Sequence, residues 1–274
     1  MIGTPGQKIP LILDTGSANM WITSTACTDE VCKKHIQFDR KKSSTYKHVG
    51  LKTDISFGTA RIIGELNSDT FGFGDITIKD QKFGEIEHEI GNVFAEEDFS
   101  GLMGLAYPSM ASHGQTPVFD NMIKQKLLKH NIMTFFYSLN ENTDGQVSFG
   151  FIDETKYHGK IHYYDVIDKW FWNIMVSDIL YDGKSLGLCP HGCRTAVDTG
   201  TSLNTAPTAF IDSLLKQIPI NDDCHGYEKA GNFTYVIGNE KYDLLPEEYM
   251  MKTEVHGKPA CLKNFMPLDV PAPQ

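Results

Sequence analysis

The chain has 274 residues, of which 41% are hydrophobic and 22% are charged, and its formal net charge at pH 7 is −10. This length is enough to bury one large core or two medium cores. The acidic balance, without a stripe of lysine and arginine, argues against a nucleic-acid-binding surface. No apolar run approaches the roughly 18 residues that a membrane-spanning helix needs, so we expect no membrane span.

The first predicted elements surround an Asp-Thr-Gly tripeptide at residues 14–16. Residues 9–13 and residues 20–22 are short apolar segments on either side of it, and short apolar runs separated by turn residues are typical of β-strands. The same tripeptide returns at residues 198–200, again directly after apolar residues. One copy is ordinary turn chemistry, whereas two copies with matching flanks indicate two related halves.

Six cysteines form two close pairs and one wide pair: Cys27 and Cys32, Cys189 and Cys193, and Cys224 and Cys261. Six cysteines allow 15 connectivities, and this spacing favours two small loop disulfides and one that closes a longer loop. A zinc site built from the two close pairs is the alternative, although their spacings differ from the C-x2-C pattern of structural zinc sites. Disulfides would imply an oxidising compartment.

Hairpins are predicted where two β-type segments flank a turn that contains glycine. One hairpin joins residues 53–57 to residues 62–66 across residues 58–61, and another joins residues 135–139 to residues 146–149. A further strand covers residues 172–181 and ends at an Asp-Gly turn. The chain therefore looks rich in strands along its whole length.

Helical periodicity is confined to two short segments. Residues 117–128 and residues 208–217 carry apolar side chains at the spacing of one helix face. We therefore expect an all-β protein with a few short helices, divided into lobes at residues 1–155 and residues 156–274.

Several segments, in the right order along the chain, resemble the pepsin-like aspartic proteases of the cathepsin D and plasmepsin type. They are Asp-Thr-Gly-Ser at residues 14–17 followed by Trp21, Phe-Gly-Thr at residues 57–59, residues 101–108, residues 117–121, and Asp-Thr-Gly-Thr-Ser at residues 198–202. The resemblance covers essentially the whole chain. It implies a bilobal fold of double-ψ β-barrels with a cleft between the lobes, and three disulfides, Cys27–Cys32, Cys189–Cys193 and Cys224–Cys261.

The resemblance also implies the chemistry. Asp14 and Asp198 would form a catalytic pair that shares one proton and activates water, with no metal or other cofactor. Two carboxylates about 3 Å apart cannot both ionise cheaply, which explains the shared proton. The residues that would support this pair are Thr15, Gly16, Ser17, Thr199, Gly200 and Thr201.

The expected activity is hydrolysis of peptide bonds in peptides or proteins at acid pH, with bulky apolar residues beside the cut bond. The resemblance further implies inhibition by pepstatin-like compounds, synthesis as a zymogen, a monomer, and delivery through the secretory pathway to a lysosome- or vacuole-like compartment or to the outside. The alternative function is a non-catalytic, peptide-binding member of the same fold.

The hairpin over residues 53–66 would be the flap that covers the substrate. Phe57 stands where the family usually has tyrosine, so the hydroxyl that would bond to the Trp21 indole is missing, and Ala60 replaces the usual glycine. The substrate-binding residues implied by the resemblance are Ile12, Phe57, Gly58, Thr59, Phe94, Phe99 and Leu102. Phe171, Trp172 and Asn173 match a segment near the subsites beyond the cut bond.

The second half departs from the family pattern after Cys261, where no hydrophobic-hydrophobic-glycine segment mirrors residues 102–104. We therefore expect segments to be missing at both ends, an incomplete C-terminal lobe and poor support for Asp198. The 274-residue chain alone would then be unstable or inactive.

Overall fold

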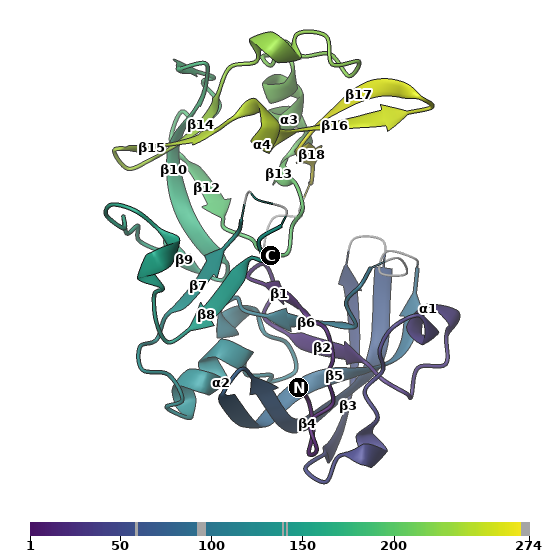
Figure 1. The fold of residues 1–274 in the computed structure, drawn as a ribbon. Helices are drawn as coiled ribbons and strands as arrows, with labels where there is room; N and C mark the ends of the chain where they lie inside the picture. Colours follow the sequence, from purple (N-terminus) through teal and green to yellow (C-terminus); the bar gives the residue numbers. More distant parts are fainter. Residues whose placement is uncertain (58–59, 92–96, 139, 141, 270–274) are drawn as a thin grey trace. The chain divides into compact units, whose positions relative to one another are not determined.

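The computed structural model describes residues 1–57, 60–91, 97–138, 140 and 142–269. In this part the chain is mostly strand with a few short helices, which confirms the predicted fold class (Figure 1). It divides into two compact units, which we call unit 1 (Met1–Tyr163 with Asp198–Gly200) and unit 2 (Tyr164–Val197 with Thr201–Gln274). The second Asp-Thr-Gly tripeptide therefore packs with the first half of the chain.

Unit 1 is built on one six-stranded sheet in the order β1-β6-β2-β5-β4-β3. Its strands are β1 (Ile12–Asp14), β2 (Met20–Thr23), β3 (Lys47–Phe57), β4 (Ala60–Phe73), β5 (Ile76–Ile90) and β6 (Gly101–Gly104). Strand β6 lies between β1 and β2, parallel to the first and antiparallel to the second. The two strands that flank the first Asp-Thr-Gly are thus held together by a strand from much later in the chain.

Strands β3, β4 and β5 form a long antiparallel meander (Figure 1). The predicted loop at residues 58–61 is too long, because Ala60 and Arg61 already belong to β4 and pair with Phe57 and Ser56. Arg61 Nε donates a hydrogen bond to Asp54 Oδ1 at 2.7 Å across the two strands, and this ion pair helps to keep them together up to the turn.

The core of unit 1 lies where this sheet packs against helix α2 (Val118–Lys124). The helix buries Val118, Phe119 and Met122, and they join a cluster that includes Met20, Ile22, Phe38, Phe71, Phe83 and Met103. The helix ends four residues before the predicted limit of 128, because Lys126 takes a left-handed backbone with φ of 57°.

The remaining elements of unit 1 are short. They are helix α1 (Glu30–Lys33), the 3-10 turns η1 (Arg40–Lys42), η2 (Pro108–Met110) and η3 (Glu154–Lys156), and the antiparallel strands β7 (Met133–Phe136) and β8 (Gln146–Phe149). Strands β7 and β8 form the hairpin expected at residues 135–149, with Phe135 opposite Val147.

Unit 2 has a second sheet in the order β11-β10-β14-β15, and β9 and β12 also pair with β10. The strands of the whole unit are β9 (Asp168–Lys169), β10 (Trp172–Tyr181), β11 (Lys184–Ser185), β12 (Cys193–Ala196), β13 (Asn204–Ala206), β14 (Phe233–Ile237), β15 (Glu240–Leu244), β16 (Met250–Val255), β17 (Lys258–Lys263) and β18 (Phe265–Pro267). Strands β13 and β18 form a separate pair, and so do β16 and β17. Strand β10 has the predicted bounds. Asp182 and Gly183, with φ of 49° and 73°, make the tight turn that follows it.

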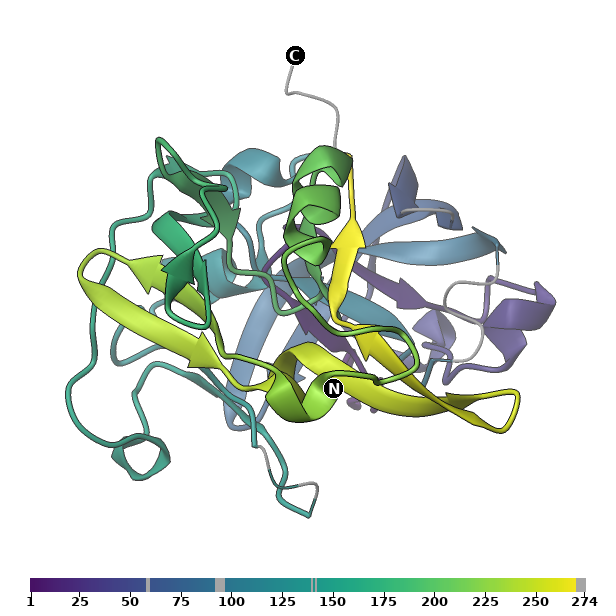
Figure 2. The same cartoon turned by 90° about the horizontal axis from the view of Figure 1, so that it is seen from above.

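The helices of unit 2 are α3 (Thr208–Leu215), η4 (Tyr227–Lys229) and α4 (Pro246–Tyr249). Helix α3 covers most of the predicted helix at residues 208–217 and lies beside β18, which pairs in parallel with β13 (Figure 2). The core of this unit contains Val176, Ile211, Leu214, Phe233, Tyr249 and Phe265. Within the described residues, no helix is both long and apolar enough to cross a membrane.

All six cysteines are disulfide-bonded, as Cys27–Cys32, Cys189–Cys193 and Cys224–Cys261. A cluster of possible metal ligands at Cys27, Asp29 and Cys32 has both of its sulfurs in one of these bonds. Because zinc binds thiolates, the oxidised chain does not offer the zinc site that the close pairs left open.

The wide disulfide of unit 2 is expected to stabilise it more than the close one. Replacing Cys224 and Cys261 with alanine should lower the free energy of unfolding by about 4 kcal/mol, because the bond joins residues separated by 37 positions. The matched double replacement of Cys189 and Cys193, separated by 4 positions, should cost only about 2 kcal/mol. Urea unfolding measures both, and equal losses would contradict the loop-length argument.

Candidate active site

The two Asp-Thr-Gly tripeptides meet in unit 1. Asp14 is the last residue of β1 and lies opposite Gly104 of β6, and its carbonyl accepts a hydrogen bond from Leu105 N at 2.8 Å. The side chain is buried, with Asp14 only 7% exposed. Asp198 follows β12 and belongs to the same compact unit as Asp14.

Each carboxyl group is bound by its own tripeptide in the same way. Gly16 N donates to Asp14 Oδ1 at 2.8 Å, and Gly200 N donates to Asp198 Oδ1 at 2.8 Å. Ser17 Oγ also donates to Asp14 Oδ2. The carboxyl group of Asp198 lies close enough to that of Asp14 to raise the pKa of Asp14.

The two threonines lock the tripeptides together. Thr15 N donates to Thr199 Oγ1 at 3.0 Å, and Thr199 N donates to Thr15 Oγ1 at 2.9 Å. Thr199 Oγ1 donates in turn to the carbonyl oxygen of Leu13 at 2.7 Å. Because hydroxyl and backbone groups satisfy one another in this exchange, the two aspartates are held in a fixed mutual position.

The two glycines are required by close approach. A Cβ built on Gly16 would lie closer than 3.0 Å to three atoms of the Asp198 carboxylate, and one built on Gly200 would overlap the Asp14 carboxylate in the same way. Glycine is the residue that lets a backbone come this near to another group. The arrangement is reciprocal, since each glycine makes room for the aspartate of the other tripeptide.

The environment of Asp14 favours its protonated form. Burial raises the pKa of Asp14 to about 6, and the nearby charge of Asp198 acts in the same direction. The hydrogen bonds that Asp14 accepts from Ser17 and Gly16 lower its pKa and offset part of this rise. A pair of adjacent carboxyl groups that retains one proton well above the ordinary range of aspartate can act as acid and base at once.

Tyr137 is a neighbour of the pair that the sequence did not point to. Its side chain is hydrogen-bonded to Thr199, and partial burial together with the Asp198 charge raises the pKa of Tyr137. The residue is 67% exposed overall, so its ring is open to solvent while its hydroxyl meets the site. The only sequence signal was a tyrosine in the middle of the strand predicted at residues 135–139.

Three of the predicted substrate-binding residues lie in one small apolar cluster. Leu102 is buried there with Trp21, and Ile12 and Phe99 pack against them. Ile12 and Leu102 are direct partners in the pairing of β1 with β6, so this cluster adjoins Asp14 through two strands. The side chain of Phe57 and residues Gly58, Thr59 and Phe94 lie outside the described part of the chain.

The other predicted site residues belong to unit 2. Trp172 begins β10 after Phe171, Asn173 is buried, and Trp172 O accepts a hydrogen bond from Val197 N at 3.1 Å. Thr201 is exposed and opens the second stretch of this unit. Their roles remain predictions.

Comparison with known proteins shows the family of the chain. The family model described as eukaryotic aspartyl protease matches residues 1–273. The chain is 36% identical to cathepsin D of Chionodraco hamatus, with 99% of the chain and 72% of the relative covered. It is 35% identical to cathepsin E of Mus musculus (99% and 70% covered) and 34% identical to pepsin A of Bos taurus (98% and 73% covered).

These relatives indicate an aspartic-type endopeptidase, a hydrolase of peptide bonds. The residue pattern that suggested this class extends over nearly the whole chain rather than over one motif. The chain belongs to the eukaryotic aspartyl protease family.

Proposed function

We propose that the chain is an aspartic endopeptidase in which Asp14 and Asp198 are the catalytic pair. The observation that carries the proposal is the reciprocal fit of the two tripeptides, in which each glycine leaves room for the carboxylate of the other aspartate and each carboxyl group accepts a glycine N–H. A structural turn does not need a second acid beside a buried aspartate, which is a costly arrangement. A site that transfers protons needs an acid and a base next to each other, and two adjacent carboxyl groups can supply both.

The mechanism follows from one shared proton. The ionised member of the pair takes a proton from a water molecule, and the resulting hydroxide attacks the scissile carbonyl carbon. The protonated member gives its proton to the carbonyl oxygen, which forms a neutral gem-diol without a covalent enzyme intermediate. The hydrogen bonds from Gly16, Gly200 and Ser17 keep both carboxyl groups in place, and the pair as a whole holds the proton.

We further propose that the substrate has bulky apolar residues beside the cut bond. The cluster of Leu102, Ile12 and Phe99 supports this preference, since it places apolar side chains on the strands that carry Asp14. The three disulfides support a route through the oxidising secretory pathway, towards an acidic compartment or the outside.

The test uses the protein of the complete open reading frame and measures its cleavage of a fluorogenic peptide with two apolar residues at its centre, from about pH 3.5 to 7 with and without pepstatin. We expect cleavage in acid that pepstatin abolishes. The rate should fall as the pH rises through about 6, because the pair then loses its shared proton. A folded protein that binds the peptide but does not cleave it at any pH would favour the non-catalytic, peptide-binding alternative.

A further inference from the structure

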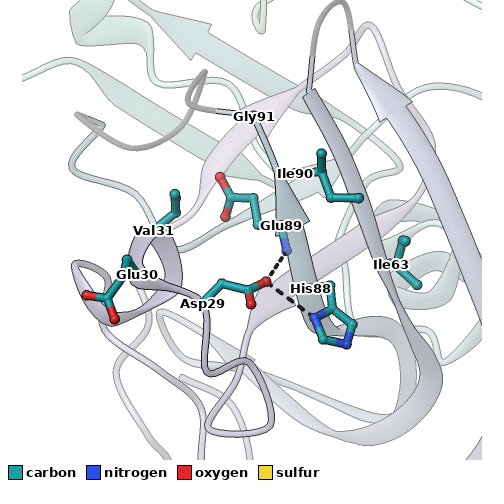
Figure 3. Close-up of a pocket in the computed structure, with 8 residues that line it drawn as sticks. All are labelled: Asp29, Glu30, Val31, Ile63, His88, Glu89, Ile90 and Gly91. Carbon is teal, nitrogen blue, oxygen red and sulfur yellow. Dashed lines mark hydrogen bonds and ion pairs between the residues drawn. The ribbon is translucent and has the colours of Figure 1, made fainter.

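Unit 1 carries an open pocket of about 650 Å³ at the end of β5, beside the start of helix α1 (Figure 3). Its walls come from the start of helix α1, from the last residues of β5 and from Ile63 of β4. None of these residues belongs to the aspartate pair or to the apolar cluster beside it. The pocket is therefore a separate feature of the unit.

One end of β5 creates this pocket. Strand β5 pairs with β2 only as far as Ile86, so the backbone of the following residues is left without a strand on that side. Asp29, just before α1, covers this edge, and its Oδ2 accepts a hydrogen bond from Glu89 N at 3.0 Å. The same oxygen lies 3.4 Å from His88 Nδ1. Asp29 is thus already engaged in holding the pocket wall.

Glu89 is the side chain that this arrangement leaves unexplained. It is 7% exposed, and its Oε1 has no hydrogen-bond partner among the described residues. Burial, and to a lesser degree the charge of Asp29, raise the pKa of Glu89. Figure 3 shows the carboxylate directed away from His88 and Ile90, into the space beside Val31. A buried carboxylate without a partner is costly, so its presence points to a ligand that supplies one.

The lining combines negative charge with aliphatic surface. Asp29, Glu30 and Glu89 are acidic, and Lys33, the cation that pairs with Glu30 at 2.6 Å, is not part of the lining. The apolar side chains are Val31, Ile63 and Ile90. The side chains of lysine and arginine complement such a lining. Their hydrocarbon stem packs on apolar surface, and their charged end binds a carboxylate acceptor.

A metal ion fits the lining less well. Among the described residues, the ligand groups that converge within 4.8 Å are Cys27, Asp29 and Cys32, and both sulfurs there are oxidised. Asp29, His88 and Glu89 do not form such a converging set. A volume of about 650 Å³ is also far larger than one ion requires.

We propose that this pocket binds a lysine or arginine side chain of a protein ligand, with the charged end at the Glu89 carboxylate and the stem against Val31. The site is independent of catalysis by the aspartate pair. It would give the protein a way to select polypeptides by a basic residue in addition to the apolar residues at the cut bond.

Binding of a small probe tests the proposal directly. The probe is the peptide acetyl-Gly-Arg-Gly-amide, and its control is the same peptide with citrulline, which keeps the stem but has no charge. Titration followed by NMR should show that the arginine peptide binds at least about tenfold more tightly than the citrulline peptide. Glu89→Gln should remove this preference. Glu87→Gln, on the same strand but outside the pocket and paired with Lys52 at 3.1 Å, should retain it.

A second measurement separates a binding role from a structural one. Without ligand at pH 7, Glu89→Gln should melt at a higher temperature than the parent protein, because the change removes a buried carboxylate whose Oε1 has no partner among the described residues. The proposal is overturned if both peptides bind equally, or if Glu89→Gln melts lower while its binding is unchanged. It is also overturned if Ca²⁺ binds and the arginine peptide does not, since the pocket would then be a metal site.

Discussion

Replacing Asp14 by asparagine is expected to lower kcat/KM for peptide cleavage by at least about 10⁴-fold. Asparagine has nearly the same shape, and its oxygen can still accept the hydrogen bond that Gly16 N donates to Asp14 at 2.8 Å. It can neither take a proton from water nor give one to the carbonyl oxygen. The loss therefore measures proton transfer rather than geometry. Initial rates on the fluorogenic peptide at acid pH give the value.

The same variant should remain folded, and its stability should depend on pH in a defined direction. The pKa of Asp14 is about 6 in the folded protein, against an ordinary value of 3.8. The folded state therefore binds the proton more tightly, and this stabilisation is complete below about pH 4 and is lost as the pH rises through 6. Asparagine does not titrate. The variant should gain up to about 3 kcal/mol relative to the parent between pH 4 and pH 7.

Asp75→Asn is the matched control, because Asp75 is exposed in the turn between β4 and β5. It should not change the rate of cleavage. If Asp14→Asn kept a rate within tenfold of the parent, the assignment of the catalytic pair would be wrong. If the relative stability of the two proteins did not change with pH, the proton would not reside in the pair.

The local sequence predicted the secondary structure better than the pairing of the strands. The hairpin at residues 135–149 and strand β10 follow from strand-type segments that lie beside Asp-Gly turns. The insertion of β6 between β1 and β2 could not be derived in this way, because pairing between strands far apart in the chain leaves no local periodicity. The end of α2 was missed for another reason, since the left-handed turn at Lys126 is no standard stop signal.

The part of the candidate site that could be predicted is the part that occurs twice in the sequence. Two copies of Asp-Thr-Gly suggested that Asp14 and Asp198 meet, whereas the role of Tyr137 depends on a tertiary contact with Thr199. Glu89 was missed because it lies between His88 and Ile90 and is buried while both neighbours are exposed. Hydrophobicity alone would place the isoleucine inside and the glutamate outside. A buried glutamate beside an exposed isoleucine is expected where the side chains serve a binding site rather than the hydrophobic core.

Gly200→Ala is expected to reduce kcat/KM by about 10²-fold or more, and Gly16→Ala by a similar factor. The added Cβ would overlap the carboxylate of the other tripeptide, so one of the two groups must move. A displacement of about 1 Å at a catalytic group is enough to cost about 10² in rate. Gly72→Ala is the matched control, because the nearest atom to its Cβ lies 3.5 Å away. Its rate should equal that of the parent.

The cause of that loss can be isolated by a double-mutant cycle on stability. Gly200→Ala should lower the free energy of unfolding by about 1–3 kcal/mol, the usual cost of overpacking. In the Asp14→Ala background the same change should cost clearly less, because the two carboxylate atoms nearest to the new Cβ are gone. Residues in contact give such coupling, whereas independent sites are additive. Additive losses would mean that Gly200 acts through its own backbone, and a large coupling would show that each tripeptide is shaped to admit the aspartate of the other.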